Sequence, residues 1–260
     1  PIPLPTRYHV TFGEPRRFEG NPADVRGHNA IAMRRMGLVD AEVEVGFINS
    51  LKMALGTAVV GTGVVFLGAY LLEKTPGPAW LRSSVRLLAM LPMAVPGLVP
   101  GLGYIFFFNE PSNPLNPLYH TMTLLTLCTI VHFYTTGHLT AVTALKALDA
   151  EFEAVSASLK VPFWVTLRRV TVPICMPAML DIARYFFVNT MTTISAVVFL
   201  YSPETKVASI AILNLDEAGE IGAAAACAVM IAVASTVATT LLWLLSRWIE
   251  RRTQAWKAES

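Results

Sequence analysis

The sequence has little charge and few cysteines, and both scarcities exclude classes of protein. Only 15% of its 260 residues are charged, against about 25% in a typical soluble domain, while 54% are hydrophobic. This composition favours a single membrane-embedded unit over one or two soluble domains. The net charge of +2 gives no indication of nucleic-acid binding.

Motifs for metal binding, ATP binding and catalysis are also missing. Cys128, Cys175 and Cys227 lie far apart, without CxxC or Cys/His spacing, so we expect buried thiols and no metal site. The phosphate-binding pattern GxxxxGK[ST] is absent, and no Gly-Lys pair occurs anywhere. No Ser/His/Asp arrangement stands out. We therefore expect a chain that is not an enzyme and binds no cofactor.

Long apolar runs dominate what is present. A helix needs about 20 apolar residues to cross a bilayer, and five segments qualify. We predict an all-α membrane protein, a five-helix bundle within residues 47–252. Its predicted spans are about 50–73, 85–108, 119–142, 174–200 and 220–247. In the second span, "GLVPGLG" (97–103) is expected to bend or thin the helix.

The two ends of the chain are polar. Residues 1–46 are rich in arginine and contain no span, so we predict an extracytoplasmic N-terminal segment there, and a cytoplasmic tail at 253–260. The chain begins at Pro1 rather than Met, which suggests a fragment or a processed product.

Lysine and arginine in the short loops predict the orientation. Five spans place the two ends of the chain on opposite sides of the membrane. One side collects most of the short-loop cations: Lys74, Arg82, Arg86, Lys146, Lys160, Arg168, Arg169, Arg247, Arg251, Arg252 and Lys257. We therefore predict an N-terminus outside and a C-terminus in the cytoplasm.

The segment 149–173 interrupts the apolar runs on that cytoplasmic side. Its six charged residues would cost at least about 15 kcal/mol at mid-bilayer, so it cannot span. We predict two short helices, with Asp149 as N-cap, Pro162 in the first turn of the second helix and Pro173 ending it. Phe152, Val155 and Leu159 share one apolar face.

Two interpretations of this segment remain open on composition alone. Its apolar face could pack back on the bundle as an ordinary loop. Alternatively, it could be a docking element for a soluble partner.

A resemblance favours docking. "EAVSASLK" and "VTLRRVTVP" are similar to the two ends of the EAA loop of type I ABC importer permeases, and "FINSLKMAL" (47–55) resembles the start of their first core helix. Lys160 stands where that family usually has Gly. The resemblance implies a set of residues that couple to the ATPase: Glu153, Ala154, Val155, Ser156, Leu159, Lys160 and Phe163.

The resemblance also implies partner subunits and a cellular location. Such a chain lies in the bacterial inner membrane with a second permease domain, two cytoplasmic ATPase subunits that bind the ATP, and a periplasmic binding protein. The stretches "LPMAVPGLVPGLGYIFFFN" and "NTMTTISAVVFLYSPETKVASIAILNLDEAG" resemble permeases assigned to 2-aminoethylphosphonate import, and in particular the second half of a fused permease. A permease for a different substrate, such as ferric iron, is the alternative.

Polar residues inside the spans are candidates for the translocation pathway. Asp181 and Arg184 are three residues apart on a helix and can pair, either to anchor the bundle or to act as a gate or an anion contact. We predict pathway positions at Asn189, Thr192, Thr193 and Tyr134, with interhelical hydrogen bonding as the alternative. His132 and His138 are expected to be satisfied structural histidines.

Two other function classes compete with the importer. An ion-coupled secondary transporter would require a coupling site and usually internal repeats, and the sequence has no convincing repeat. A membrane-embedded enzyme would require a catalytic constellation, and none is evident.

Overall fold

A computed structural model describes residues 43–75, 77–149 and 151–253. Contacts between Cα atoms divide the chain into residues 1–40 and 41–260, and the described residues all belong to the second unit. Most of the predicted N-terminal segment and the predicted tail from 254 onward lie outside the described residues, so both stay predictions.

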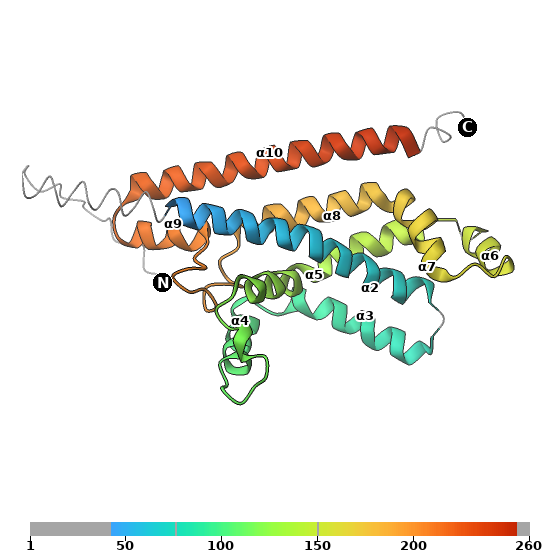
Figure 1. The fold of residues 1–260 in the computed structure, drawn as a ribbon, viewed down its shortest axis with the longest axis horizontal. Coiled ribbons are helices and arrows are strands. Elements are labelled where there is room, and N and C mark those ends of the chain that lie inside the picture. Colours follow the sequence, from blue (N-terminus) through green and yellow to red (C-terminus); the bar gives the residue numbers. More distant parts are fainter. Residues whose placement is uncertain (1–42, 76, 150, 254–260) are drawn as a thin grey trace, which may run out of the picture. The chain divides into compact units, whose positions relative to one another are not determined.

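The described residues form helices joined by turns, without a strand (Figure 1). The first helix is Val43–Lys74, whose second part is α2 (Thr62–Lys74). It is followed by α3 (Ala79–Ala94), α4 (Leu98–Phe108), α5 (Met122–Lys146), α6 (Glu151–Ser158) and α7 (Phe163–Thr166). The chain ends with α8 (Val172–Thr192), α9 (Ala208–Glu217) and α10 (Ile221–Thr253). The predicted all-α bundle is confirmed.

The core forms where three helices approach closely. Phe186 of α8 is fully buried between the first helix and α5. A methyl group added at Gly61 or at Gly137 would lie 3.2–3.3 Å from the Phe186 ring. These two glycines therefore bring the backbones of the first helix and α5 within reach of one aromatic side chain, as small residues do in membrane bundles.

Two of the long helices contain a π turn. The turns are Thr57–Gly61, before α2, and Leu167–Thr171, between α7 and α8. Residues Phe163–Thr192 thus form one continuous helix, and the prediction that Pro173 ends a helix was wrong. A π turn already leaves one carbonyl without its usual i+4 donor. Pro173, two residues after the turn Leu167–Thr171, therefore removes little further hydrogen bonding from the helix.

The second predicted span is broken. α3 and α4 are separated by Val95–Gly97 and bent by 108°. Pro92 lies inside α3 and has no N–H to donate to the Leu88 carbonyl one turn earlier. In the same turn, the Thr135 hydroxyl of α5 donates to the Ala89 carbonyl at 2.8 Å. The break lies at the edge of the predicted bend (97–103), most of which is regular helix in α4.

The fourth predicted span ends early. We expected it to continue to residue 200, but α8 ends at Thr192 and residues 195–200 form turns. Two carbonyls near the start of this segment accept hydrogen bonds from side chains, while those of Ile194 and Val197 accept from backbone N–H groups in the turns. Thr193 accepts from the Ser209 hydroxyl at 2.6 Å, and Ala196 accepts from the Cys128 thiol at 3.2 Å. The segment is buried against α5 and α9.

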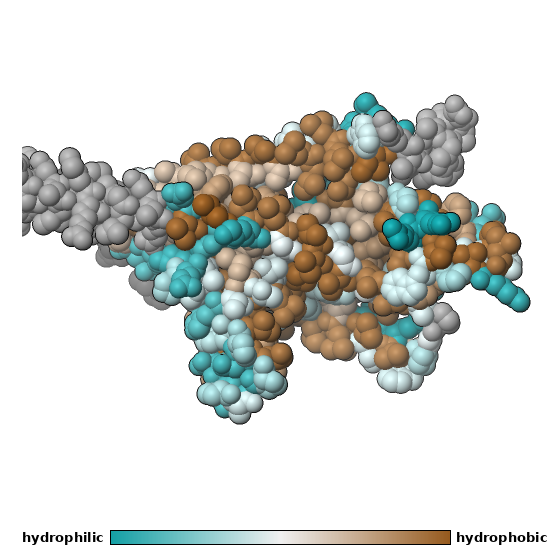
Figure 2. Space-filling view, in the orientation of Figure 1, coloured by the Kyte–Doolittle hydropathy of each residue, from teal (hydrophilic) through white to brown (hydrophobic). Residues whose placement is uncertain are grey.

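Three of the described helices are long and apolar enough to cross a membrane: Val43–Lys74, Phe163–Thr192 and Ile221–Arg251. The bent pair α3–α4 makes a fourth if it counts as one span. The helix α5 is not among them, and its sequence includes two histidines and several threonines. Because α5 packs against α2, α3 and α8, those polar groups lie largely inside protein. Figure 2 shows the apolar surface of α10, most of which is exposed.

Candidate translocation pathway and coupling surface

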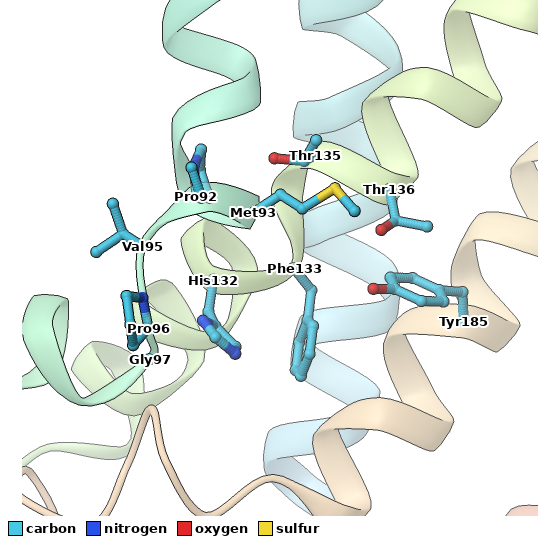
Figure 3. Close-up of a pocket in the computed structure, with 11 residues that line it drawn as sticks. Pro92, Met93, Val95, Pro96, Gly97, His132, Phe133, Thr135, Thr136 and Tyr185 are labelled. Carbon is cyan, nitrogen blue, oxygen red and sulfur yellow. The ribbon is translucent and has the colours of Figure 1, made fainter.

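A pocket of about 470 Å³ lies where the α3–α4 break meets α5 and α8 (Figure 3). Val95, Pro96 and Gly97 contribute irregular backbone to its wall, while His132 and Tyr185 contribute polar side chains. Irregular backbone at membrane depth occurs where protein buries it or where it lines a water-filled cavity. This combination is therefore the arrangement expected beside a polar passage.

The broken segment packs tightly at one edge of this pocket. A methyl group added at Gly97 would lie 2.5 Å from the Ser195 Oγ and 2.8 Å from the His132 Cε1. The unwound segments after α3 and after α8 therefore meet at Gly97 and Ser195. The Nδ1 of His132 is buried and has no hydrogen-bond partner among the described residues.

A polar stripe on α8 passes the pocket at Tyr185. Asp181, Arg184, Tyr185 and Thr192 are each exposed or half-buried at helical spacing, and Thr192 lies at a separate pocket shared with α9 and α10. Asp181 and Arg184 form an ion pair at 3.0 Å, as predicted, with side chains 51% and 36% exposed. Charged side chains at mid-bilayer cost several kcal/mol when they face lipid. This face therefore requires water or protein beside it.

The second candidate site is the segment between α5 and α8, beyond one end of the bundle (Figure 1). The Asp149 carboxylate accepts a hydrogen bond from the Glu151 N–H at 3.0 Å and caps α6, as predicted. The apolar side chains of α6 do not pack back on the bundle. Phe152 and Val155 are exposed, and Leu159 is 69% exposed. The ordinary-loop interpretation is therefore wrong for α6.

The turn after α6 explains how Lys160 replaces a glycine. Lys160 has φ +53°, in the left-handed region. Its N–H donates to the Ala157 carbonyl and the Val161 N–H donates to the Ser156 carbonyl, at 3.1 and 3.0 Å. These two bonds define a Schellman motif, which usually has glycine at this position. The turn thus keeps the glycine geometry despite the lysine side chain.

Contacts with the bundle attach the second half of this segment. The ring of Phe163 stacks on Tyr70 of α2 with centroids 6.3 Å apart, and Leu167 is buried. Glu73 at the end of α2 pairs with Arg86 of α3 at 2.9 Å and lies 4.0 Å from Lys146 of α5. The exposed α6 therefore adjoins an end of the bundle where α2, α3, α5 and α7 contact one another.

Residues 64–253 match the family described as "Binding-protein-dependent transport system inner membrane component". The chain belongs to this family of permeases. The resemblance drawn from the sequence is confirmed at the level of the family, which is one of multi-pass inner-membrane proteins.

Relatives of this permease are named for two kinds of transport. It is 33% identical to the ferric transport system permease protein FbpB of Actinobacillus pleuropneumoniae over 68% of this chain and 26% of FbpB. It is 27% identical to PhnV of Salmonella typhimurium, named for 2-aminoethylphosphonate transport, over 76% of each chain. The chain spans about a quarter of the length of FbpB.

Solved structures share the fold. A bacterial alginate ABC transporter, in complex with a periplasmic protein that binds an alginate pentasaccharide, contains a chain with a TM-score of 0.66 to this permease. The match covers 80% of this chain and 78% of the other, at 15% identity. A likeness at this identity concerns the fold alone.

The predicted pathway residues of the permease occupy different surroundings. Thr192 is exposed on the polar stripe, and Asn189, beside it, donates to the Tyr185 carbonyl at 2.8 Å. Thr193 is buried where α8 ends. Tyr134 is half-buried, stacks on His138 and points its hydroxyl at Gly68 of α2, away from the pocket residues.

Several site features differ from the sequence-based picture. Tyr185 and the irregular segment Val95–Gly97 were missed, although Pro92 and Pro96 flank the break and Tyr185 follows the ion pair. His138 is buried as expected, yet neither ring nitrogen has a hydrogen-bond partner among the described residues. The expected hydrogen-bond partner of His138 is therefore not found among the described residues.

The predicted ATPase-coupling residues lie on α6, on the turn that follows it and, in the case of Phe163, at the start of α7. Ala154, Val155, Leu159, Lys160 and Phe163 are exposed, and Ser156 is half-buried. The side chain of Glu153 lies outside the described residues.

Proposed function

We propose that this chain is the membrane-spanning permease subunit of an ATP-driven, binding-protein-dependent importer, and that it performs no catalysis itself. Family membership supports the transport role. The uncovered apolar face of α6 supports coupling to a soluble partner, because Phe152, Val155 and Leu159 are left exposed by the described part of the chain. The proposed partner at this surface is one of two cytoplasmic ATPase subunits, which bind the ATP.

The proposed orientation places α6 in the cytoplasm and the opposite end outside. The end of the described bundle that holds α6 is the cationic one, and the positive-inside rule assigns such loops to the cytoplasm. Its lysines and arginines are Lys74, Arg82, Arg86, Lys146, Lys160, Arg168, Arg169, Arg247 and Arg251. The loops 109–121 and 201–207 then face a periplasmic binding protein.

The proposed pathway follows the polar stripe of α8 and the pocket beside it. A second permease domain on the other side of the stripe would shield Asp181 and Arg184 from lipid. The pathway would then run between the two domains, past Tyr185 and His132. The alternative, an ion-coupled secondary transporter, would use the same ion pair as its coupling site.

For the solute, we propose 2-aminoethylphosphonate or a related small anion. Relatives that match this chain over three quarters of both lengths are named for that substrate. Ferric iron is the second candidate, because relatives named for it have the higher identities, 33% and 36%. Uptake of labelled 2-aminoethylphosphonate and of labelled iron, each with its own binding protein, distinguishes the two.

The decisive experiment for the importer tests docking at α6. We would purify the tagged permease with its ATPase and compare retention of the ATPase by the native chain and by Leu159→Glu. We expect at least about a tenfold loss of retention, equivalent to 1.4 kcal/mol. Because Leu159 is exposed, the substitution should not disturb the fold.

A matched control makes the same change at the other end of the bundle. Leu115→Glu also places a carboxylate at an exposed leucine and should leave retention unchanged. Equal retention by the Leu159 variant would place the docking site elsewhere. If no ATPase associates with the native chain, and uptake follows an ion gradient instead, the secondary transporter becomes the better interpretation.

A further inference from the structure

One buried asparagine fixes the loop that precedes α9. Asn49 lies in the first helix and is only 7% exposed. Its side-chain amide donates to the carbonyl of Glu204 at 2.8 Å and to the carbonyl of Lys206 at 3.0 Å. An amide NH₂ has two protons to donate, so both are used on one short stretch of loop. Asn49 therefore sets the path of residues 201–207.

The next residue fixes the start of α9. Ser50 is fully buried, and its hydroxyl accepts a hydrogen bond from the Ala208 N–H at 2.8 Å. One turn earlier, a methyl group added at Gly46 would lie 3.3–3.4 Å from Ala211 and Ala208. The first helix can thus approach α9 closely because this position has no side chain.

A third hydrogen bond continues from α9 to the end of α8. Ser209 is buried, and its hydroxyl donates to the Thr193 carbonyl at 2.6 Å. Thr193 is the residue at which α8 becomes extended, with φ −70° and ψ +135°. Two residues later, Ser195 lies against Gly97 of the α3–α4 break. The connection therefore runs from the loop to the edge of the pocket.

We propose that Asn49, Ser50 and Ser209 form a hydrogen-bonded strap that couples loop 201–207 to the two unwound segments beside the pathway. A binding protein that displaces this loop would move Thr193 and Ser195, and with them the contact to Gly97. The three are positioning residues, since none of them lines the pocket. This proposal rests on the proposed function, which places loop 201–207 outside and against the binding protein.

Directional bonds suit this role better than apolar packing. Each strap residue bonds to backbone outside its own helix, across 16 to 158 positions of sequence. Two elements that meet only through apolar side chains can slide past each other, so a movement of one is passed on incompletely to the other. By contrast, a buried hydrogen bond resists stretching, because breaking it leaves polar groups unsatisfied. The strap thus adds directional bonds between three elements that otherwise meet through buried apolar residues.

The first test measures coupling in proteoliposomes that contain the complete transporter. The quantity is the ratio of ATP hydrolysis with and without substrate-loaded binding protein. Asn49→Asp removes both donors at constant size, and Ser209→Ala removes the hydroxyl. We expect each to lower this ratio at least about fivefold, the lower end of typical coupling between sites. The double variant should lose little more than the larger single effect.

A matched control tests the loss of a hydroxyl as such. Thr236→Ala removes a hydroxyl that donates only within its own helix, to the Ala232 carbonyl at 2.8 Å, and should leave the ratio unchanged. A native ratio in both Asn49→Asp and Ser209→Ala would overturn the strap.

The second test separates the strap from the importer function. Hydrogen exchange of the full chain in detergent requires no partner. Asn49→Asp should raise the exchange of amides in 201–208 at least about tenfold. Asn113→Asp, which breaks a comparable bond to the Phe107 carbonyl in another loop, should leave that region protected. If the native complex shows no ATP hydrolysis, the importer function fails, and unchanged exchange in Asn49→Asp would still overturn the strap.

Discussion

At the scale of single residues, two backbone positions are constrained by what surrounds them. Lys160 adopts a left-handed conformation that glycine enters freely and other residues enter at a cost of about 1–2 kcal/mol. Gly97 has an ordinary helical φ, but its α-carbon faces Ser195 and His132 at close range. The first position tolerates a side chain at the expense of strain, and the second leaves no space for one.

Replacing Lys160 by glycine should therefore stabilise the turn after α6. We expect the free energy of unfolding to rise by about 1 kcal/mol, less than the full conformational cost because glycine gains entropy in the unfolded chain. Chemical unfolding in detergent measures it. Lys160→Ala removes the same charge and keeps the Cβ, so it should give no gain. A gain with alanine would indicate that charge, not backbone strain, decides stability here.

Replacing Gly97 by alanine should have the opposite effect. The added methyl group would overlap Ser195 and His132, and overpacking of this kind typically costs about 1–3 kcal/mol. Gly103 of α4 provides the control, because a methyl group there meets nothing within 4 Å. Gly103→Ala should match the native stability or exceed it, since alanine favours a helix. Thermal unfolding of both variants checks the difference, and a native melting temperature for Gly97→Ala would contradict the packing argument.

At the scale of elements, the break between α3 and α4 depends on a residue of another helix. The Thr135 hydroxyl bonds to the Ala89 carbonyl, in the turn of α3 that precedes Pro92. Helix-breaking residues are tolerated inside membranes when side chains of neighbouring helices bond to the backbone beside them. The geometry of the broken pair, and hence the wall of the pocket, is therefore partly determined by α5.

Thr135→Val keeps the shape of the side chain and removes its hydroxyl. We expect a loss of about 0.5–1.5 kcal/mol in unfolding free energy and a wider distribution of α3–α4 distances by spin labelling. Thr140→Val is the control, because that hydroxyl bonds within its own helix, to the Thr136 carbonyl at 3.0 Å, and connects no second element. Equal effects of both substitutions would show that the bond to Ala89 has no special role.

The sequence predicted the elements better than their ends. Apolar length located the long helices, and Asp149 and Pro162 located the starts of α6 and α7, because these signals are local. The end of α8 was missed because "TISAVVFL" (193–200) is as apolar as a span. The side chains that bond to its backbone lie elsewhere in the sequence: the Ser209 hydroxyl donates to the Thr193 carbonyl and the Cys128 thiol to the Ala196 carbonyl.

The candidate sites also contain features that local sequence predicts and features that it does not. The ion pair of Asp181 and Arg184 was predictable, since both partners lie on one helix turn. The wall at Val95–Gly97 and the orientation of Tyr134 depend on contacts between helices, which periodicity does not report. The sequence did not decide whether α6 is exposed. An amphipathic helix needs an apolar surface to cover it, and its own pattern is the same whether that surface belongs to the bundle or to a partner.

At the scale of the whole unit, the described surface presents three kinds of face. The helix α10 offers an apolar face, α8 a polar stripe with an ion pair, and α6 an apolar tip beside many cations. Under the proposed function each meets different surroundings: lipid, a polar passage beside a second domain, and a soluble partner. The permease is thus built to be one part of a larger assembly.

The proposed orientation can be measured on this chain with thiol labelling. The native cysteines are buried, so they should give little background with a membrane-impermeant maleimide. In right-side-out membrane vesicles, Ser112→Cys should react and Ser158→Cys should not, because both serines are exposed and the proposed orientation places the α4–α5 loop outside and α6 in the cytoplasm. Permeabilised vesicles should label both. Labelling of Ser158→Cys alone in intact vesicles would invert the proposed orientation.

The π turns at Thr57–Gly61 and Leu167–Thr171 have a consequence for how relatives are aligned. Each adds one residue to a turn, and one residue rotates everything beyond it by about 100° around the helix axis. A relative with a regular α-helix at either place should therefore lack one residue there. Insertions and deletions in this family should then occur at these two points inside helices, and an ungapped alignment would assign the wrong faces to the rest of both.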